Sequence, residues 1–501
     1  MDLARKIGKL FVVPARGDVI RHVRENHVGG VIWFESTAAE AKAVNAHLQS
    51  ISETPLLISA DLEAGMGMRF TDTTWWPPAM ALAATGDPAL AEEEARATAR
   101  EALEIGVNHI LAPVADVNVD PQNPVINTRS FGEDPHDVAR YVAAFVRGVQ
   151  EEGCLATAKH FPGHGDTRVD SHRALPVLDV TRERLDAVEL VPFRAAIDAG
   201  VGSIMTGHLA VPALDDTPAP VRAEFENVYG TSSDEVTRGG TLPATVSKKM
   251  IDFLRRDLAF DGLIVTDSFD MGGLAAHFDP GEAAVRAIEA GNDQILYSAD
   301  TDAAIAAVKY AVLTGRLPES RINESLERIA AAAERSARLQ PGEGGLKPAP
   351  TLFIAQRAIT LVRDASSLLP LRQTNFTTVV VSDFPEPNPV PDAVRMLGGD
   401  ALFLDANSSE PQTNELVVML LALRPKSGAG RIAVPAAARR LAERHARTTI
   451  AVSFGSPYVL REIQDVSTYI CAYGIQPVMQ IAAIRALRGE ADMPGRLPVT
   501  L

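Results

Sequence analysis

Short apolar runs recur along the first two thirds of the chain, and most of them end in polar side chains. They are the segments 9–15, 29–34, 55–63, 107–117, 154–161, 202–211, 262–269 and 292–298. Apolar runs of this length, bounded by polar residues and glycines, are typical of strands that are buried in a parallel sheet. The pattern therefore predicts eight strands within residues 1–335.

Helical patterns separate several of these runs. In the segment 87–106, Asp87 is a candidate N-cap, Pro88 takes the first helical position, and Gly106 ends the pattern. A second helical segment, 247–260, begins with Ser247 as its N-cap. Eight strands that alternate with helices predict a closed (β/α)8 barrel of the TIM type, and a doubly wound open sheet is the competing architecture.

A stretch rich in glycine and proline, 336–350, separates this part from a smaller one. Further apolar runs follow it at 377–383, 401–405, 415–423, 448–457 and 468–474, with a helical pattern at 436–447. We therefore expect a TIM-barrel catalytic domain over 1–335, a linker over 336–350 and a second α/β domain over 351–501. The polar segment 215–245 is expected to form a long surface loop near the rim of the barrel.

Composition narrows the class of protein. Apolar residues make up 46 % of the 501, enough for a large core, and the net charge of −16 argues against nucleic acid or an anionic membrane as the main partner. The two cysteines, Cys154 and Cys471, match no disulfide framework and no cysteine zinc site. No apolar run is long enough for a transmembrane helix, and the N-terminal segment is too short and too interrupted for the apolar core of a signal peptide, so we expect a cytoplasmic protein.

The segment 158–172, AKHFPGHGDTRVDSH, concentrates titratable side chains just after a predicted strand. Its two glycines and its proline exclude a regular helix, so we expect a loop over the barrel mouth, where functional side chains of this fold gather. Asp170 lies two residues before His172, and on a turn its carboxylate can accept a hydrogen bond from one imidazole nitrogen. The other nitrogen is then free to carry a proton, which suits acid–base catalysis near neutral pH.

Other predicted strand ends deliver further polar side chains. Asp267 directly follows the apolar residues 263–266, and the remaining ones are Asp61, Glu63, Arg69, Arg129 and His208. Each of them is also compatible with a helix cap or an ordinary ion pair. Several carboxylates and cations around one mouth, without a glycine-rich phosphate loop, indicate a polyhydroxylated small substrate.

Four segments together resemble glycoside hydrolase family 3, and more narrowly its bacterial β-N-acetylglucosaminidase branch. They are KHFPGHGDTRVDSH (159–172), NTRSFGEDP (127–135), SIMTGHL (203–209) and GLIVTDSFDMGGL (262–274). The resemblance covers nearly all of 1–335. It continues in AQRAITLVRDASSLLPLR, VSFGSPYVL and RALRGEADMPGRLPVTL, which look like the family's C-terminal α/β sandwich domain.

The resemblance implies a role for each candidate residue. Asp267 falls on the nucleophile, His172 on the histidine acid/base of this branch, and Asp170 on its carboxylate partner. The positions that hold the cleaved sugar fall on Asp61, Arg69, Arg129, Lys159 and His160. Since the loop histidines are assigned to sugar contact and proton transfer, we expect no metal and no other cofactor, and an oligosaccharide as the partner.

The implied activity is hydrolysis of terminal β-linked N-acetylglucosamine in cell-wall or chitin-type saccharides, through a glycosyl-enzyme. A β-glucosidase or a phosphorylase on the same fold is the main alternative. A metallohydrolase that uses His160, His164 and His172 is disfavoured because the loop lacks an HExxH pattern. A non-catalytic sugar-binding module is disfavoured because Asp267 and the Asp170–His172 pair are both present.

This chain also departs from the family pattern in three places. DLEAGMGMR (61–69) lacks the usual pair of glycines after the glutamate, 215–245 looks like an insertion, and the C-terminal domain looks short.

Overall fold

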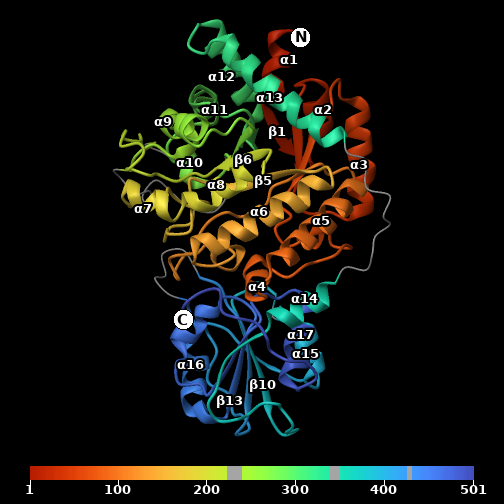
Figure 1. The fold of residues 1–501 in the computed structure, drawn as a ribbon, viewed down its shortest axis with the longest axis vertical. Coiled ribbons are helices and arrows are strands. Elements are labelled where there is room, and N and C mark those ends of the chain that lie inside the picture. The colour runs from red at the N-terminus through yellow and green to blue at the C-terminus, as the bar shows by residue number, and fades with distance from the viewer. Residues whose placement is uncertain (223–239, 339–349, 387, 426–431) are drawn as a thin grey trace. The chain divides into compact units, whose positions relative to one another are not determined.

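The computed structural model describes residues 1–222, 240–338, 350–386, 388–425 and 432–501 (Figure 1). The chain divides into two compact units. The first contains Met1–Thr74, Glu92–Val117 and Ala139–Lys347, and the second contains Trp75–Ala91, Asn118–Val138 and Pro348–Leu501. A single boundary near 336–350 does not describe this division, because two segments from the first 335 residues group with the C-terminal part.

The first unit is built on a parallel sheet that, over the described residues, has eight strands in the order β7-β6-β5-β4-β3-β2-β1-β8. The strands are β1 (Phe11–Pro14), β2 (Gly30–Trp33), β3 (Leu57–Ala60), β4 (His109–Ile110), β5 (Leu155–Phe161), β6 (Ser203–Thr206), β7 (Leu263–Thr266) and β8 (Ile295–Leu296). Each lies within one of the eight predicted apolar runs. A parallel bridge between Val265 and Gln294 joins β7 to the start of β8 and brings the two ends of the sheet together. The predicted TIM-type barrel is confirmed, and the open sheet is not formed.

The barrel interior is filled by apolar side chains from six strands or the residues next to them. They are Val12, Ile32, Leu111, Met205, Val265 and Leu296, all at most 3 % exposed. Because side chains alternate along a strand, these positions form one inward layer, and the next inward position on each strand reaches the mouth. This apolar layer lies directly beneath the polar side chains at the carboxyl ends of the strands.

Helices connect the strands and surround the sheet. They are α1 (Leu3–Gly8), α2 (Val19–Arg24), α3 (Ala38–Ile51), α5 (Pro88–Glu104), α6 (Pro135–Glu151), α7 (Arg182–Ala187), α8 (Leu190–Asp198), α9 (Lys248–Asp252), α10 (Gly272–Ala275), α11 (Pro280–Ala290), α12 (Thr301–Leu313) and α13 (Glu319–Arg338). The predicted N-caps are confirmed: Asp87 Oδ1 accepts from Ala89 N at 3.2 Å, and Ser247 Oγ accepts from Met250 N at 3.2 Å. The segment 247–260 is not one regular helix, because a π-helical turn, Phe253–Asp257, follows α9.

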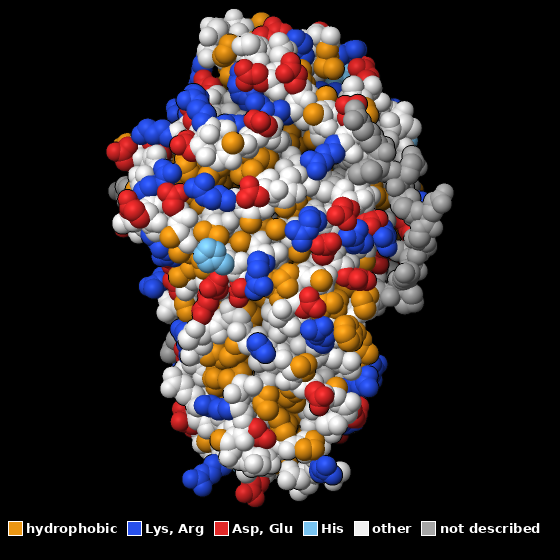
Figure 2. All heavy atoms as spheres, in the orientation of Figure 1, with side chains coloured by type: hydrophobic (Ala, Val, Ile, Leu, Met, Phe, Trp, Pro, Cys, Tyr) orange, Lys and Arg blue, Asp and Glu red, His pale blue; other side chains and the backbone are white. Residues whose placement is uncertain are grey.

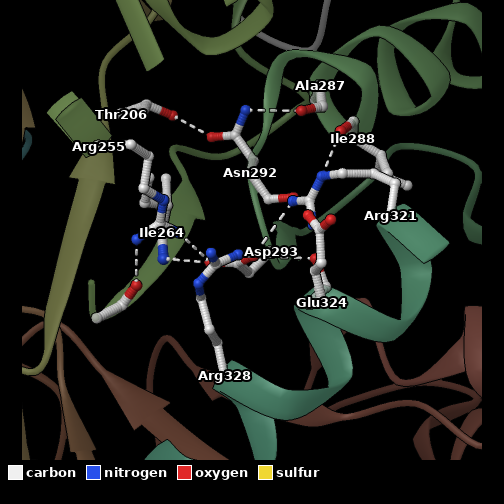
Figure 3. A network of polar contacts seen from close by, with 12 residues as sticks. Thr206, Arg255, Ile264, Ala287, Ile288, Asn292, Asp293, Arg321, Glu324 and Arg328 are labelled. Atoms are coloured by element: carbon white, nitrogen blue, oxygen red, sulfur yellow. Dashed lines mark hydrogen bonds and ion pairs between the residues drawn. The ribbon is translucent and has the colours of Figure 1, made fainter. Parts of the chain in front are cut away.

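A buried carboxylate ties α13 to the amino-terminal end of β8. Asp293, fully buried, accepts hydrogen bonds from Arg255 at 2.6 Å and from Arg321 and Arg328 at 3.2 Å each (Figure 3). Ser325 Oγ and the Ile264 N–H donate to the same carboxylate. Three guanidinium groups around one buried carboxylate satisfy its hydrogen-bonding capacity and compensate its desolvation.

The second unit contains another sheet, which has six strands within the described part of the chain, in the order β11-β10-β12-β13-β14-β9. The strands are β9 (Thr360–Asp364), β10 (Thr377–Ser382), β11 (Leu402–Leu404), β12 (Val417–Ala422), β13 (Thr449–Ser453) and β14 (Thr468–Cys471). Five match predicted runs and pair in parallel, whereas β9 was not predicted as a strand and pairs antiparallel with β14. The helices of this unit include α4 (Ala79–Ala84), α14 (Thr351–Ala358), α15 (Pro391–Met396), α16 (Ala436–Arg444) and α17 (Pro477–Leu487).

Two expected loops are only partly described. The segment 215–245 has an antiparallel base in which Pro218 pairs with Thr241, and its residues 223–239 lie outside the described part. The expected linker 336–350 begins inside α13, which ends at Arg338, and 339–349 lie outside the described part. Among the helices that the structure describes, none has the length and hydropathy to cross a membrane. On the face shown in Figure 2, acidic and basic side chains are interspersed.

Candidate active site

The carboxyl ends of the barrel strands carry most of the polar side chains singled out from the sequence. Asp61 directly follows β3, Lys159 and His160 lie near the end of β5, and Asp267 directly follows β7. Because all strands of a parallel barrel point the same way, these residues share one rim, which is where enzymes of this fold place their chemistry.

A buried ammonium group organises one side of the mouth. Lys159, whose side chain is 2 % exposed, places Nζ 2.7 Å from Asp61 Oδ1 and 2.6 Å from Glu63 Oε1. Arg69 approaches the second oxygen of Asp61 at 2.8 Å. Burial alone would raise the pKa of the Asp61 carboxyl, but the charges of Lys159 and Arg69 lower it to about 2. These ion pairs hold the side chains in fixed positions.

Asp116 is a site residue that the sequence analysis missed. It is fully buried, and its Oδ2 lies 2.8 Å from His160 Nδ1. Its Oδ1 accepts from the backbone N–H groups of His160, at 3.1 Å, and His164, at 2.7 Å. With Nδ1 donating to a carboxylate, Nε2 is the nitrogen of His160 that can meet a ligand. The sequence feature that could have identified Asp116 is its position in the apolar run 107–117, after the residues of β4.

His164 shapes the loop from within. Its Nδ1 lies 2.7 Å from Thr167 Oγ1, and its Nε2 lies 3.0 Å from Ser171 Oγ. Burial lowers the pKa of His164 to about 4, so the ring is neutral at physiological pH. Because both ring nitrogens are engaged inside the loop, His164 is a structural residue.

The pairing expected between Asp170 and His172 is present. Asp170 Oδ1 lies 2.8 Å from His172 Nδ1 and also accepts from the His172 backbone N–H at 2.9 Å. Burial would raise the pKa of Asp170, but the hydrogen bond and charge of His172 hold it below the usual range. The carboxylate fixes the imidazole so that Nε2 is directed away from Asp170, and the His172 side chain is 41 % exposed.

Asp267 is half-buried and well positioned. Its backbone N–H donates to Thr206 O at 3.0 Å, and its Oδ1 accepts from the Ser268 N–H at 2.8 Å. Burial would raise the pKa of Asp267, but the nearby His160 and His208 and the Ser268 N–H hold it below the usual range. The group is therefore an ionised carboxylate at neutral pH.

His208, which lies two residues after β6, supports the same segment. Its Nε2 donates to Ser268 O at 2.8 Å, and its Nδ1 lies 2.8 Å from Thr245 Oγ1. Burial lowers the pKa of His208, which keeps the ring neutral and suits this division of donor and acceptor. His208 therefore holds the backbone next to Asp267.

The histidine loop is attached directly to the segment that carries Asp267. Gly272 N donates to His172 O at 2.8 Å, and Gly273 N donates to Ser171 O at 2.9 Å. A Cβ on Gly273 would lie 3.0 Å from His208 O and 3.1 Å from Ser171 O, so the close approach favours glycine. These contacts join a candidate proton donor to a candidate nucleophile.

Arg129 belongs to the second compact unit, whereas the other expected site residues belong to the first. It lies on the 3-10 turn Asn127–Arg129 of the second unit, where its guanidinium donates to Val125 O at 3.1 Å. Its contribution to the sugar site stays a prediction. Over the described residues, no group of three or more His, Cys, Asp and Glu side chains is arranged to hold a metal ion.

Comparisons with known proteins agree with this geometry. Residues 2–332 match the model of the glycosyl hydrolase family 3 N terminal domain. A protein of Cellulomonas fimi named beta-N-acetylglucosaminidase/beta-glucosidase is 32 % identical, over 99 % of this chain and 93 % of its own length.

Two solved structures resemble the whole chain. A family 3 beta-N-acetylglucosaminidase from Paenibacillus sp. str. FPU-7 superposes with a TM-score of 0.83 at 32 % identity, covering 100 % of this chain and 99 % of that one. A structure titled beta-glucoside phosphorylase BglX gives a TM-score of 0.85 at 25 % identity, covering 100 % and 94 %. The family match covers well over half of the sequence, and the chain therefore belongs to glycosyl hydrolase family 3.

Proposed function

We propose that this protein is a retaining β-N-acetylglucosaminidase, which removes terminal β-linked N-acetylglucosamine from cell-wall or chitin-type saccharides. The observation that carries the proposal is the 2.8 Å contact between Asp170 and His172. The loop that holds this pair is hydrogen-bonded through its backbone to Gly272, in the segment that follows Asp267. The names of the Cellulomonas and Paenibacillus relatives support the choice of sugar.

In the first step, Asp267 attacks the anomeric carbon while His172 gives its Nε2 proton to the departing oxygen. Since the Ser268 N–H occupies Asp267 Oδ1, we assign the attack to Oδ2. The C–O bond to the leaving group breaks as the ester bond to Asp267 forms, which gives a glycosyl-enzyme. Asp170 stabilises the imidazolium before transfer and keeps the ring in one tautomer afterwards.

In the second step, neutral His172 takes a proton from water. The oxygen of that water attacks the anomeric carbon from the side of the sugar ring on which the leaving group was bound. Asp267 departs as a carboxylate, for which its lowered pKa is suited. Two displacements at one carbon return the β configuration. Asp61, Arg69, Lys159 and His160 are assigned to the hydroxyl groups of the cleaved sugar.

Two measurements test the proposal. Proton NMR of the first product should show the β anomer before mutarotation, and an α anomer would exclude a retaining mechanism. The kcat/KM for a nitrophenyl N-acetyl-β-glucosaminide should exceed that for the corresponding β-glucoside. A kcat/KM for the glucoside that equals or exceeds the other would identify the enzyme as a β-glucosidase instead.

Phosphorolysis is a second candidate, favoured by the similarity to the structure titled beta-glucoside phosphorylase BglX. Phosphate is an anion, and an imidazole at the base position repels it less than a carboxylate would. Rates and products measured with and without inorganic phosphate distinguish the two candidates. A sugar 1-phosphate as the main product in phosphate buffer would establish the phosphorylase.

A further inference from the structure

The part of the barrel mouth near β1, β2 and β8 carries a pair of aromatic side chains, Phe34 and Tyr297. Trp33 pairs with Ala60 in the parallel register of β2 and β3, so Phe34 is the next residue alongside Asp61. Ile32 faces the barrel interior, and side chains alternate along the strand, so Phe34 faces inward one level higher. The aromatic ring therefore borders the polar side of the mouth.

Phe34, Tyr297 and Arg16 form a continuous shelf, which we call the β1–β8 shelf. The rings of Phe34 and Tyr297 lie 5.5 Å apart at 56°, and both are half-buried against the interior layer. The guanidinium of Arg16 lies 5.4 Å above the Phe34 ring, and its NH2 group donates to the Tyr297 hydroxyl at 3.3 Å. Arg16 makes no ion pair with another described residue, so its remaining N–H groups are available to a ligand.

Tyr297 links this shelf to the segment behind the nucleophile. Its carbonyl oxygen accepts from Phe269 N at 3.2 Å, and Phe269 lies two residues after Asp267. Its φ of +44° is unusual for a bulky residue. Backbone conformations of this kind persist mainly where the surrounding structure enforces them, often at functional sites.

A cavity of about 320 Å³ opens beside the shelf, lined by Arg16, Phe34 and the exposed Glu35 among others. An aromatic face with a nitrogen donor and a carboxylate acceptor at its edges matches the chemistry of a sugar ring. The ring stacks its C–H groups on the aromatic face, while its hydroxyls accept from the guanidinium and donate to the carboxylate. The cavity is large enough for one pyranose.

We propose that the β1–β8 shelf is the binding subsite for the leaving-group sugar, so that the natural substrate is a saccharide and not a small-aglycone glycoside. This inference rests on the proposed function, because it takes the cleaved sugar to lie over Asp267. The Asp267 segment is bonded on one side to the His172 loop and on the other to Tyr297. The proposal requires a leaving group that is protonated by His172 to extend across that segment to the shelf.

The test compares two substrates whose leaving groups differ in size but are both alkoxides. They are methyl N-acetyl-β-glucosaminide and the β-linked disaccharide of N-acetylglucosamine. The wild type should prefer the disaccharide. Phe34→Leu keeps apolar bulk but removes the aromatic face, and it should lower the disaccharide-to-methyl ratio of kcat/KM about three- to tenfold. Arg16→Gln, at an exposed position that poses little risk to folding, should lower the ratio in the same direction.

Tyr310→Ala is the matched control, since Tyr310 is 70 % exposed on α12 and is not one of the three shelf residues. Its ratio should equal that of the wild type. An unchanged ratio in both shelf variants, or an equal loss on both substrates, would overturn the subsite. Failure of the wild type to cleave either substrate would instead overturn the proposed function.

Discussion

The backbone N–H of Gly272 donates to the carbonyl oxygen of His172 at 2.8 Å, which bonds the loop of the candidate acid/base to the segment of the candidate nucleophile. The neighbouring bond from Gly273 to Ser171 repeats the contact one residue along each segment. A retaining mechanism requires the two groups at a set separation through both steps. The two backbone bonds supply that constraint without using either side chain.

Gly273→Ala should therefore impair chemistry more than binding. The new Cβ would lie 3.0 Å from His208 O and 3.1 Å from Ser171 O, so the histidine loop has to shift by a few tenths of an ångström. We expect kcat on the disaccharide to fall about tenfold with little change in KM, because small misplacements are costly in catalysis. Gly315→Ala is the control: its Cβ would meet nothing within 4 Å, but its φ of +77° strains any side chain, so this variant should lose some stability and keep the wild-type kcat. A KM effect alone would contradict this prediction.

His172→Ala should separate substrates by their leaving groups. A nitrophenolate departs with little protonation, whereas a sugar alkoxide needs it, so the disaccharide should lose about 10²–10⁴-fold more in the glycosylation step. Added azide should rescue the second step, since it attacks without a general base. Asp267→Asn should impair both substrates alike. Equal losses for His172→Ala on both substrates in pre-steady-state kinetics, with no azide rescue, would remove the acid/base assignment.

Chelation should leave activity unchanged. The ring nitrogens of His164 are both engaged within the loop, and His160 and His172 each pair through Nδ1 with a separate carboxylate. We expect the same kcat/KM after exhaustive dialysis against a chelator as before it. Activity that is lost on dialysis and restored by a divalent ion would contradict this prediction and support the metallohydrolase alternative.

Glu94→Gln should stabilise the protein at neutral pH. Glu94 is fully buried on α5, and neither of its carboxyl oxygens has a hydrogen-bond partner among the residues that the structure describes. Burial raises the pKa of Glu94 well above the usual range. A folded-state pKa above the unfolded value, about 4.3, means that the folded state binds the proton more tightly. Wild-type stability is therefore lost as pH rises from that value towards the raised pKa.

The Glu94→Gln variant avoids this loss, so we expect a gain of about 1–3 kcal/mol in unfolding free energy at pH 7. The gain should shrink as pH falls to about 4, measured by urea denaturation. Glu93→Gln, an exposed neighbour on the same helix, is the control and should change little at any pH. A gain that does not depend on pH would show that Glu94 does not titrate as argued.

Asp293→Asn should destabilise the barrel. The substitution removes the charge that three arginines share and leaves Arg255 and Arg321, whose side chains are 14 % and 13 % exposed, without their counter-ion. Removing one partner of a buried ion pair costs about 3–5 kcal/mol, which should appear as a lower urea midpoint. Asp216→Asn, on an 86 % exposed side chain paired with Lys249, should stay within about 0.5 kcal/mol of wild type.

The sequence by itself determined the order and type of the barrel elements. Buried parallel strands need apolar side chains on both faces and polar residues where they end, so all eight left a local pattern. The pairing of Asp170 with His172 was predictable for the same reason, because two residues on one turn are close whatever the rest of the chain does. The position of Asp267 followed from the end of β7.

The tertiary structure alone decided which distant residues meet. Nothing local tells that Lys159 lies between Asp61 and Glu63, that Asp116 holds His160, or that Gly272 bonds His172. The grouping of Trp75–Ala91 and Asn118–Val138 with the C-terminal sheet was equally hidden. Periodicity records which face of an element is buried, but not what covers it. Contacts between segments far apart in sequence depend on how the elements pack, and that packing forms the site.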